Sequence, residues 1–195
     1  MIISPEYRRR LIVMVKEPRA GRVKTRLGAD IGMTTAAWWF RHQVRDLLRR
    51  TDDARWQTVL AVSPYRSLNS RAWPAKYDRT TQGRGDLGHR MGAVFDQLSY
   101  GPAIIIGGDI PGITRAHIWT AFRAIDSHDA VFGPATDGGY WLIGLKRSRP
   151  RSGRMFQGVR WSTAHALGDT VISMPGYHIA YVDTLDDVDT KSDLN

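Results

Sequence analysis

The 195-residue sequence contains no cysteine, and this absence removes several kinds of chemistry at once. A chain without thiols forms no disulfide bond, no thiolate zinc site and no cysteine nucleophile. The sequence also lacks an apolar stretch of the roughly 20 residues that a membrane-spanning helix needs, so no membrane insertion is expected. The N-terminal MIISPEYRRR has no apolar region typical of a signal peptide. We therefore expect a cytoplasmic protein with a single domain over residues 1–195.

Several short catalytic motifs are missing as well. The sequence has no GxxxxGK[ST] loop, no GxSxG nucleophile turn and no HExxH pair, and the basic stretch 15–28 contains no GxGxxG dinucleotide turn. Its six histidines show no spacing typical of a zinc site. These absences argue against P-loop nucleotidases, α/β hydrolases and zinc proteases.

Lysine is scarce, at 5 of the 28 basic residues, yet the formal net charge is +9. A field of this sign attracts nucleotides, nucleic acids and other polyanions. The arginines are spread along the chain, so charge alone does not indicate nucleic acid as the main partner. A nucleotide- or nucleic-acid-binding module without catalysis is kept as an alternative.

Apolar runs alternate along the chain with segments of helical periodicity. The runs predict strands at 11–15, 58–62, 103–106, 130–132, 140–145 and 178–182. The polar residues 65–85 predict a loop with one weak strand near 79–81. The periodic segments predict helices at 34–50 capped by Thr34, at 86–99, at 114–127 capped by Thr114, and over about ten residues capped by Ser162. This alternation predicts an α/β fold with a mostly parallel sheet. Ligands of such sheets bind beyond the carboxyl ends of the strands.

The stretch VKEPRAGRVKTRLG (15–28) carries five basic residues directly after the first strand. A glycine-containing loop can offer backbone N–H groups to an anion, and Lys and Arg add positive charge. Composition alone favours a phosphate site and a solvated basic loop equally. The position of the stretch after a strand, and its company with the acidic motifs below, favours phosphate binding.

Two further motifs follow predicted strands. In IIIGGDIPG (104–112), Asp109 is well placed to hold a divalent cation that bridges phosphates, although it could also cap a turn. In GPATDGGYWLIGL (133–145), Gly138 and Gly139 indicate a tight turn between two strands. Asp137 and Tyr140 bracket this turn and could face a substrate.

The acidic segment DVDTKSDL (187–194) stands out in a basic chain. Asp187 and Asp189 alternate, so in an extended segment both carboxylates point the same way. Like charges placed together repel unless a cation lies between them. The segment therefore indicates either part of a metal site or an ordinary acidic surface tail.

Taken in order, these motifs resemble a bacterial family of predicted glycosyltransferases with the GT-A nucleotide-diphosphosugar transferase fold, related to the 2-phospho-L-lactate guanylyltransferases. The resemblance covers nearly the whole chain and rests on KEPRAGRVKTRLG, GDLGHRM, GGDIPG, GPATDGGYWLIGL, VRWST and DVDTKSDL. The guanylyltransferases share the KxRL pattern, here Lys24 to Leu27, and the DxDTxxDL tail. The resemblance implies a three-layer α/β sandwich around the central sheet.

The resemblance also implies roles for individual residues. The nucleotide phosphates would be bound by Lys16, Gly21, Lys24 and Arg26, and the metal, Mg²⁺ or Mn²⁺, by Asp109, Asp187 and Asp189. The donor or acceptor pocket would be lined by Asp86, Arg90, Gly138, Gly139 and Tyr140. Asp109 and Lys24 would act in catalysis, and Asp137 is the candidate general base.

The expected function is that of a metal-dependent transferase with a nucleotide-activated donor. Glycosyl transfer from a nucleotide-diphosphosugar to a small acceptor is the first interpretation, and nucleotidyl transfer to a small phosphorylated acid is the alternative. Both reactions need a phosphate cradle and a cation, so the motifs do not separate them. The sequence is compatible with a homo-oligomer.

Overall fold

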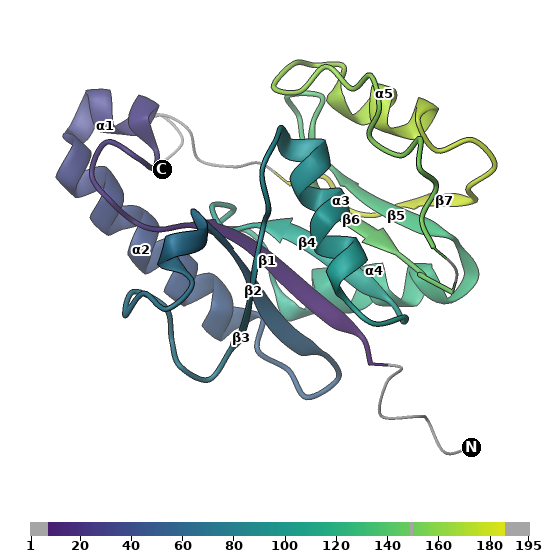
Figure 1. Cartoon of the computed structure of the whole chain (residues 1–195), viewed down its shortest axis with the longest axis horizontal. Helices are drawn as coiled ribbons and strands as arrows, with labels where there is room; N and C mark the ends of the chain where they lie inside the picture. Colours follow the sequence, from purple (N-terminus) through teal and green to yellow (C-terminus); the bar gives the residue numbers. More distant parts are fainter. Residues whose placement is uncertain (1–7, 149, 186–195) are drawn as a thin grey trace.

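The computed structural model describes residues 8–148 and 150–185. Its centre is a seven-stranded sheet of strand order β3-β2-β1-β4-β6-β5-β7 (Figure 1). The strands are β1 (Arg10–Lys16), β2 (Gln57–Ser63), β3 (Asp78–Thr81), β4 (Ala103–Gly107), β5 (Ala130–Pro134), β6 (Tyr140–Leu145) and β7 (Ile179–Tyr181). The helices are α1 (Thr25–Ile31), α2 (Met33–Arg50), α3 (Leu87–Gln97), α4 (Arg115–Ser127) and α5 (Ala166–Ile172), with a short 3₁₀ turn η1 (Tyr65–Ser67).

All strands of the sheet but β6 run in the same direction. β1 pairs in parallel with β2 and with β4, whereas β6 is antiparallel to both β4 and β5. The expected mostly parallel α/β sheet is confirmed, and so is each predicted strand. The carboxyl ends of β1, β4 and β5 consequently meet at one edge of the sheet, together with the start of β6.

Helices cover both faces of the sheet, which gives the three layers that the resemblance implied (Figure 1). Alternate residues of β1 show the division. Leu11, Val13 and Val15 belong to the core cluster that also contains the apolar sides of α2 and α4. Ile12 belongs to the opposite cluster, with Met91, Val94 and Phe95 of α3. Both faces of β1 are therefore buried, which explains its continuous apolar run.

The predicted helix starts are right at two places and wrong at two. Asp86 and Thr114 precede α3 and α4, and each side chain accepts a hydrogen bond from the backbone N–H three residues on. α2, however, begins at Met33 with Gly32 as its N-cap, one residue before Thr34.

The helix expected after Ser162 begins only at Ala166 and is seven residues long. Ser162 has a positive φ of 59° and lies in a turn. The hydroxyl of Thr163 holds this turn, because it donates to the carbonyl of Arg160 and accepts from the N–H of His165.

The basic stretch 15–28 is a loop only in its first part. From Thr25 it forms α1, in which Leu27 is fully buried. Lys24 precedes the helix in the left-handed conformation and provides no side-chain cap. The sequence therefore has no capping residue that would predict the start of this short helix. The helix is stabilised by tertiary packing, through the burial of Leu27. In the described part of the chain, no helix combines the length and apolar character needed to cross a bilayer.

Candidate active site

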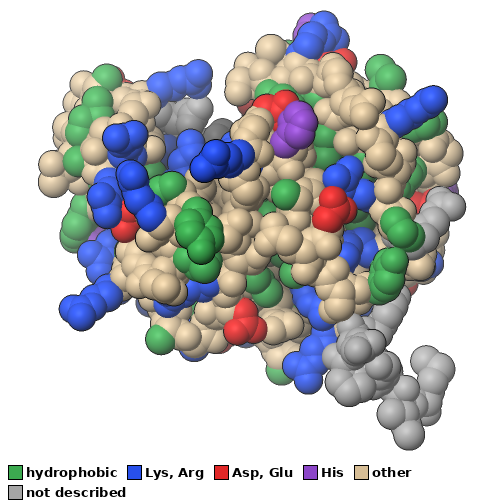
Figure 2. Space-filling model, in the orientation of Figure 1, with side chains coloured by type: hydrophobic (Ala, Val, Ile, Leu, Met, Phe, Trp, Pro, Cys, Tyr) green, Lys and Arg blue, Asp and Glu red, His purple; other side chains and the backbone are tan. Residues whose placement is uncertain are grey.

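A cavity of about 700 Å³ opens at the carboxyl ends of the strands. Most of its lining comes from four segments: the end of β1 and the residues that follow it to Arg26, residues 107–110 at the end of β4, residues 135–141 around the start of β6, and residues 161–166 before α5. Phe40 of α2, Gln82 after β3, and Leu87 and Arg90 of α3 complete it. The space-filling view shows Lys and Arg side chains gathered around the hollow between α1 and α3 (Figure 2). The cavity thus lies where an open α/β sheet binds its ligands.

The segment after β1 supplies four cationic side chains to the cavity lining, from Lys16, Arg22, Lys24 and Arg26. Arg19, in the same stretch, instead forms an ion pair of 2.6 Å with Glu17. The positive charge on this wall of the cavity suits a polyphosphate, because each cation offers N–H donors to phosphate oxygens.

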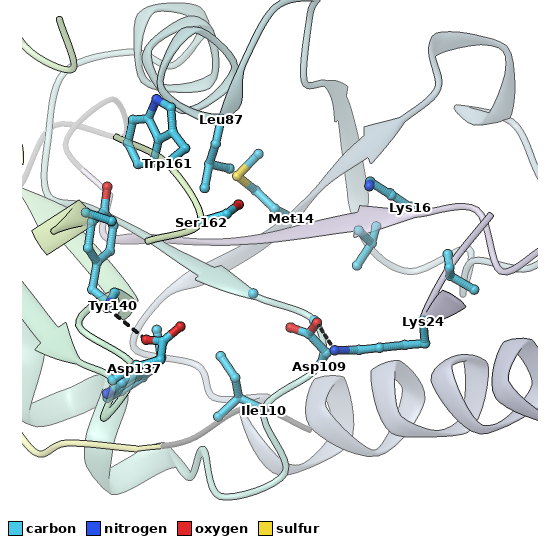
Figure 3. A pocket seen from close by; sticks show the side chains of 18 of the residues that line it. Met14, Lys16, Lys24, Leu87, Asp109, Ile110, Asp137, Tyr140, Trp161 and Ser162 are labelled. Atoms are coloured by element: carbon cyan, nitrogen blue, oxygen red, sulfur yellow. Dashed lines mark hydrogen bonds and ion pairs between the residues drawn. The ribbon is translucent and has the colours of Figure 1, made fainter. Parts of the chain in front are cut away.

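Lys24 and Asp109 meet inside the cavity. The Lys24 Nζ lies 2.7 Å from the Asp109 Oδ2, and the Lys24 side chain is only 6% exposed against 30% for Asp109 (Figure 3). The left-handed backbone of Lys24 directs the chain into α1, and the side chain spans the end of the sheet to reach β4. Two residues 85 positions apart in the sequence thereby form one charged pair.

The glycines before Asp109 have a packing reason. A Cβ at Gly107 would lie 2.9 Å from the Asp109 Oδ1, and a Cβ at Gly108 would lie 3.1 Å from a methyl group of Val15 and 3.2 Å from one of Val44. Gly107 therefore leaves room for the carboxylate of Asp109, and Gly108 allows the turn to press against β1 and α2.

Gln82 connects the floor of the cavity to α3. Its side chain is 2% exposed, and its Nε2 donates to the carbonyls of Val15 and Ala61, at the ends of β1 and β2. Its Oε1 accepts a 3.0 Å hydrogen bond from Arg90. Burial lowers the pKa of Arg90, while the carboxylate of Asp86 acts in the opposite direction. Gln82 therefore fixes where this guanidinium meets the cavity.

The wall opposite the basic segment is aromatic and nearly uncharged. Tyr140 and Trp161 line it with a ring-centroid distance of 6.5 Å and an interplanar angle of 68°. Burial raises the pKa of the Tyr140 phenol, which is near Thr170, so the hydroxyl stays protonated at neutral pH. The carboxylate of Asp137 faces the cavity from the β5–β6 turn, and its Oδ1 accepts the N–H of Gly139 at 2.8 Å (Figure 3).

Gly138 joins this turn to the loop before α5. Its φ of +84° is in the left-handed region, and a Cβ there would collide with the backbone of Ala164. The carbonyl of Gly138 accepts the N–H of Leu167 at 3.1 Å. The turn therefore positions the loop 161–166 against the cavity.

The structure brings most of the expected site residues together in one cavity. The lining includes Lys16, Lys24, Arg26, Arg90, Asp109, Asp137, Gly139 and Tyr140. Three expected residues stand beside the lining instead: Gly21 in the basic loop, Asp86 as the cap of α3, and Gly138 under the turn. Asp187 and Asp189 lie outside the described residues.

Part of the lining was not predicted from the sequence. Gln82 is an isolated residue in a polar stretch and gives no signal of its own. Trp161 was identified only within the motif VRWST, and Arg22 was not singled out from its basic neighbours. Met14 and Leu87 complete the aromatic wall, and their apolar character made them indistinguishable from core residues.

The family profile described as "Uncharacterized protein conserved in bacteria (DUF2064)" matches residues 47–163, more than half of the chain. The chain belongs to this family. No curated protein matches the DUF2064 chain in sequence. Its membership agrees with the bacterial family resemblance drawn from the motifs.

Solved structures extend the likeness beyond this family. A protein from Desulfovibrio desulfuricans G20, provisionally assigned as a nucleotide-diphospho-sugar transferase, is 29% identical, with a TM-score of 0.82 over 94% of this chain and 83% of its own. CMP:2-keto-3-deoxy-manno-octonic acid synthetase complexed with CTP is 12% identical, with a TM-score of 0.58 over 95% and 94% of the two chains. Rv0371c from Mycobacterium tuberculosis H37Rv, complexed with manganese, is 19% identical, with a TM-score of 0.54 over 96% and 95%.

These likenesses confirm the nucleotide-diphosphosugar transferase fold. The D. desulfuricans structure also confirms the expectation of a transferase-type enzyme. The two more distant structures show the shared fold alone.

Proposed function

We propose that this DUF2064 protein transfers a glycosyl group from a nucleotide-diphosphosugar to a small acceptor. The observation that carries the proposal is the convergence of Lys16, Arg22, Lys24 and Arg26 on one side of the cavity, with Asp109 at the end of β4. A nucleotide diphosphate would lie along these cations, and its sugar would extend toward Asp137.

The charge arrangement suits the reaction as well as the binding. In glycosyl transfer, the acceptor oxygen attacks the anomeric carbon, the bond from that carbon to the phosphate oxygen breaks, and the nucleoside diphosphate leaves with an additional negative charge. Lys24 and Arg26 stabilise this developing charge more than they stabilise the bound donor, which is the requirement for catalysis. Asp137 accepts the proton of the attacking hydroxyl in this scheme.

A divalent metal fits the site only together with the substrate or the acidic tail. In residues 8–148 and 150–185, no group of three His, Cys, Asp or Glu side chains converges, and Asp109 already faces Lys24. Mg²⁺ is often held by one or two carboxylates plus substrate phosphates, so Asp109 could supply the single carboxylate that such a site requires. When bound, the ion would neutralise charge on the phosphates.

Asp187 and Asp189 are proposed as the carboxylates that complete this metal site. Leu185 supports the proposal, because its N–H donates to the carbonyl of Pro134 at the carboxyl end of β5. The two aspartates thus follow a residue held at the same edge of the sheet as Asp109. The manganese complex of Rv0371c gives Mn²⁺ as the metal to try beside Mg²⁺.

Nucleotidyl transfer is the second candidate, because the same four cationic side chains can also accommodate the triphosphate of a nucleotide. In that reaction the acceptor attacks the α-phosphorus and pyrophosphate leaves. The CTP complex of the synthetase makes cytidine triphosphate a natural member of a ligand screen.

A thermal-shift screen of nucleoside triphosphates, diphosphates and nucleotide sugars with Mg²⁺ or Mn²⁺ tests the proposal. A ligand at about 100 times its dissociation constant adds roughly 2.7 kcal/mol of stability. The released product then decides the reaction, since glycosyl transfer yields a nucleoside diphosphate and nucleotidyl transfer yields pyrophosphate. Absence of a shift with every nucleotide would overturn both candidates.

Variants locate the bound nucleotide. Lys24→Gln and Arg26→Gln should each weaken nucleotide binding about tenfold or more, because each removes a charge-assisted hydrogen bond to phosphate. Arg19→Gln is the matched control, since Arg19 lies in the same stretch but pairs with Glu17. Equal affinities in all three variants would contradict the phosphate role of this segment.

A further inference from the structure

The cavity is divided into two halves of different chemistry (Figure 3). The cationic half contains Lys16, Arg22, Lys24 and Arg26 with Asp109. The aromatic half contains Met14, Leu87, Tyr140 and Trp161, with Asp137 and Ser162 at its border. In the close-up, Trp161, Leu87, Met14 and Tyr140 lie at one end, and Lys16, Lys24 and Asp109 lie at the other.

The two halves differ in net charge, and this difference determines in which half a phosphate group binds. Four cations against one carboxylate give the cationic half an excess of three positive charges. Beside the aromatic half, the described lining offers the carboxylate of Asp137 and the guanidinium of Arg90, which balance. Arg90 donates to two neutral oxygens, the Oε1 of Gln82 and the carbonyl of Asp86, so its positive charge is offset here by Asp137 and not by these bonds. A phosphate would therefore bind in the cationic half and gain little in the other.

The aromatic half is rigid and has the form of a corner. Trp161 packs against Phe156 at a ring distance of 6.1 Å, and a Cβ at Gly88 would lie 2.6 Å from its ring. Gly88 therefore lets the indole lie directly on α3. Tyr140 meets the indole at 68°, so the two rings form two walls at an angle. A flat nucleobase would stack on one wall of this corner and meet the other only with its edge, whereas a puckered ring with an apolar C–H face can contact both walls.

We propose that the aromatic half binds a neutral acceptor with an apolar face and several hydroxyl groups, such as a sugar, and that it does not bind a phosphorylated acid. The C–H face of the acceptor lies on Trp161 and Tyr140, and its hydroxyls face Asp137 and Ser162. As an acceptor site, this inference rests on the proposed transferase function. The inference excludes small phosphorylated acids, which the sequence analysis had kept as alternative acceptors.

Binding of two matched sugars tests the inference without knowledge of the donor. The full chain is saturated with pyrophosphate and Mg²⁺ to fill the cationic half, and methyl β-D-glucoside and glucose 6-phosphate are titrated separately by ligand-observed NMR. The glucoside should bind about tenfold more tightly than glucose 6-phosphate, because the charges of Asp137 and Arg90 balance in the aromatic half and give a phosphate no net attraction there. Tighter binding of glucose 6-phosphate, or no binding of the glucoside, overturns the inference.

Two variants place the glucoside in the aromatic half. Trp161→Ala should weaken the glucoside about tenfold through loss of ring contact and leave the affinity for pyrophosphate within about twofold. Trp38→Ala is the control, since Trp38 is an exposed indole on α2 outside the cavity. Unchanged glucoside binding in Trp161→Ala contradicts the inference, and so does an equal loss of nucleotide affinity, which would indicate a base on the indole.

Asp137→Asn keeps the test independent of the packing around Trp161, because an Asn side chain can still accept the N–H of Gly139. This variant should weaken the glucoside and strengthen glucose 6-phosphate, since a negative charge is removed. Changes in the same direction for both sugars overturn the proposal. If no nucleotide shifts the melting temperature but the glucoside still binds, the proposed transferase function is contradicted and the sugar site is not. The two failures are therefore distinguishable.

Discussion

At the scale of single residues, the cavity depends on a few polar side chains that are held by several partners. Gln82 is the clearest case, because one buried amide bonds the ends of β1 and β2 and the guanidinium of Arg90. The Lys24–Asp109 pair is another case, since the nearly buried amine of Lys24 joins the basic segment to the carboxylate that follows β4. Such groups are costly to bury without partners.

Gln82→Leu should reduce the free energy of unfolding by about 1–3 kcal/mol, because it removes one partner of the half-buried Arg90 guanidinium and the hydrogen bonds to the carbonyls of Val15 and Ala61. Urea denaturation measures this loss. Gln157→Leu is the matched control, since Gln157 is exposed and makes a single side-chain hydrogen bond, to the carbonyl of Gly153. An equal loss in both variants would show that Gln82 does not act through its buried bonds.

At the scale of elements, the site depends on how neighbouring turns and loops are pressed together. The β5–β6 turn carries Asp137 and also supports the loop 161–166, through the close approach of Gly138 to Ala164. The acidic and aromatic parts of the cavity are therefore coupled by one glycine.

Gly138→Ala should destabilise the protein by about 1–3 kcal/mol, because an alanine at a φ of +84° is strained and its methyl group displaces the backbone of Ala164. Gly153→Ala is the control, since Gly153 has no positive φ and its Cβ would have no neighbour within 4 Å. Chemical denaturation compares the two, and binding of methyl β-D-glucoside should fall in Gly138→Ala alone. A stable Gly138→Ala with full glucoside binding would contradict the coupling.

At the scale of the whole molecule, the net charge of +9 makes stability sensitive to acid. Hydrogen bonds from Arg55 lower the pKa of Asp53 to about 2, and bonds from Arg160 lower the pKa of Asp169 further. The pKa of Asp86 is also lowered, mainly by the N–H of His89. These carboxylates stabilise the fold when ionised.

A carboxylate whose pKa is lower in the folded state contributes stability above its unfolded pKa and loses it as pH falls toward its folded pKa. The urea midpoint should therefore fall steeply between about pH 4 and pH 2, where protonation also increases the net positive charge. Asp53→Asn should lower the midpoint at pH 6 and flatten this dependence. A midpoint that stays constant down to pH 2 would contradict the linkage.

Strands and helix starts were predicted correctly from the sequence where the pattern that identifies them lies within the element itself. Strands such as β1, β2 and β4 were found because buried parallel strands are continuous apolar runs, and Thr114 identified the start of α4 as its capping residue. α1 was missed because its only strong signal, the burial of Leu27, depends on contact with distant elements. Ser162 had the right residue type for a cap, but its positive φ placed it in a turn.

The sequence alone indicated three of the four cations of the cationic half, Lys16, Lys24 and Arg26, because they lie within one basic stretch at the end of the first strand; the structure added Arg22. The sequence also determined that Asp109 would lie at the end of a strand, since a buried run leads directly into it. Only the tertiary structure decided that Lys24 reaches Asp109, that Gln82 holds Arg90, and that Trp161 faces Tyr140. These contacts join residues far apart in the chain, and the packing of crossover helices against the sheet, which no local pattern encodes, brings them together.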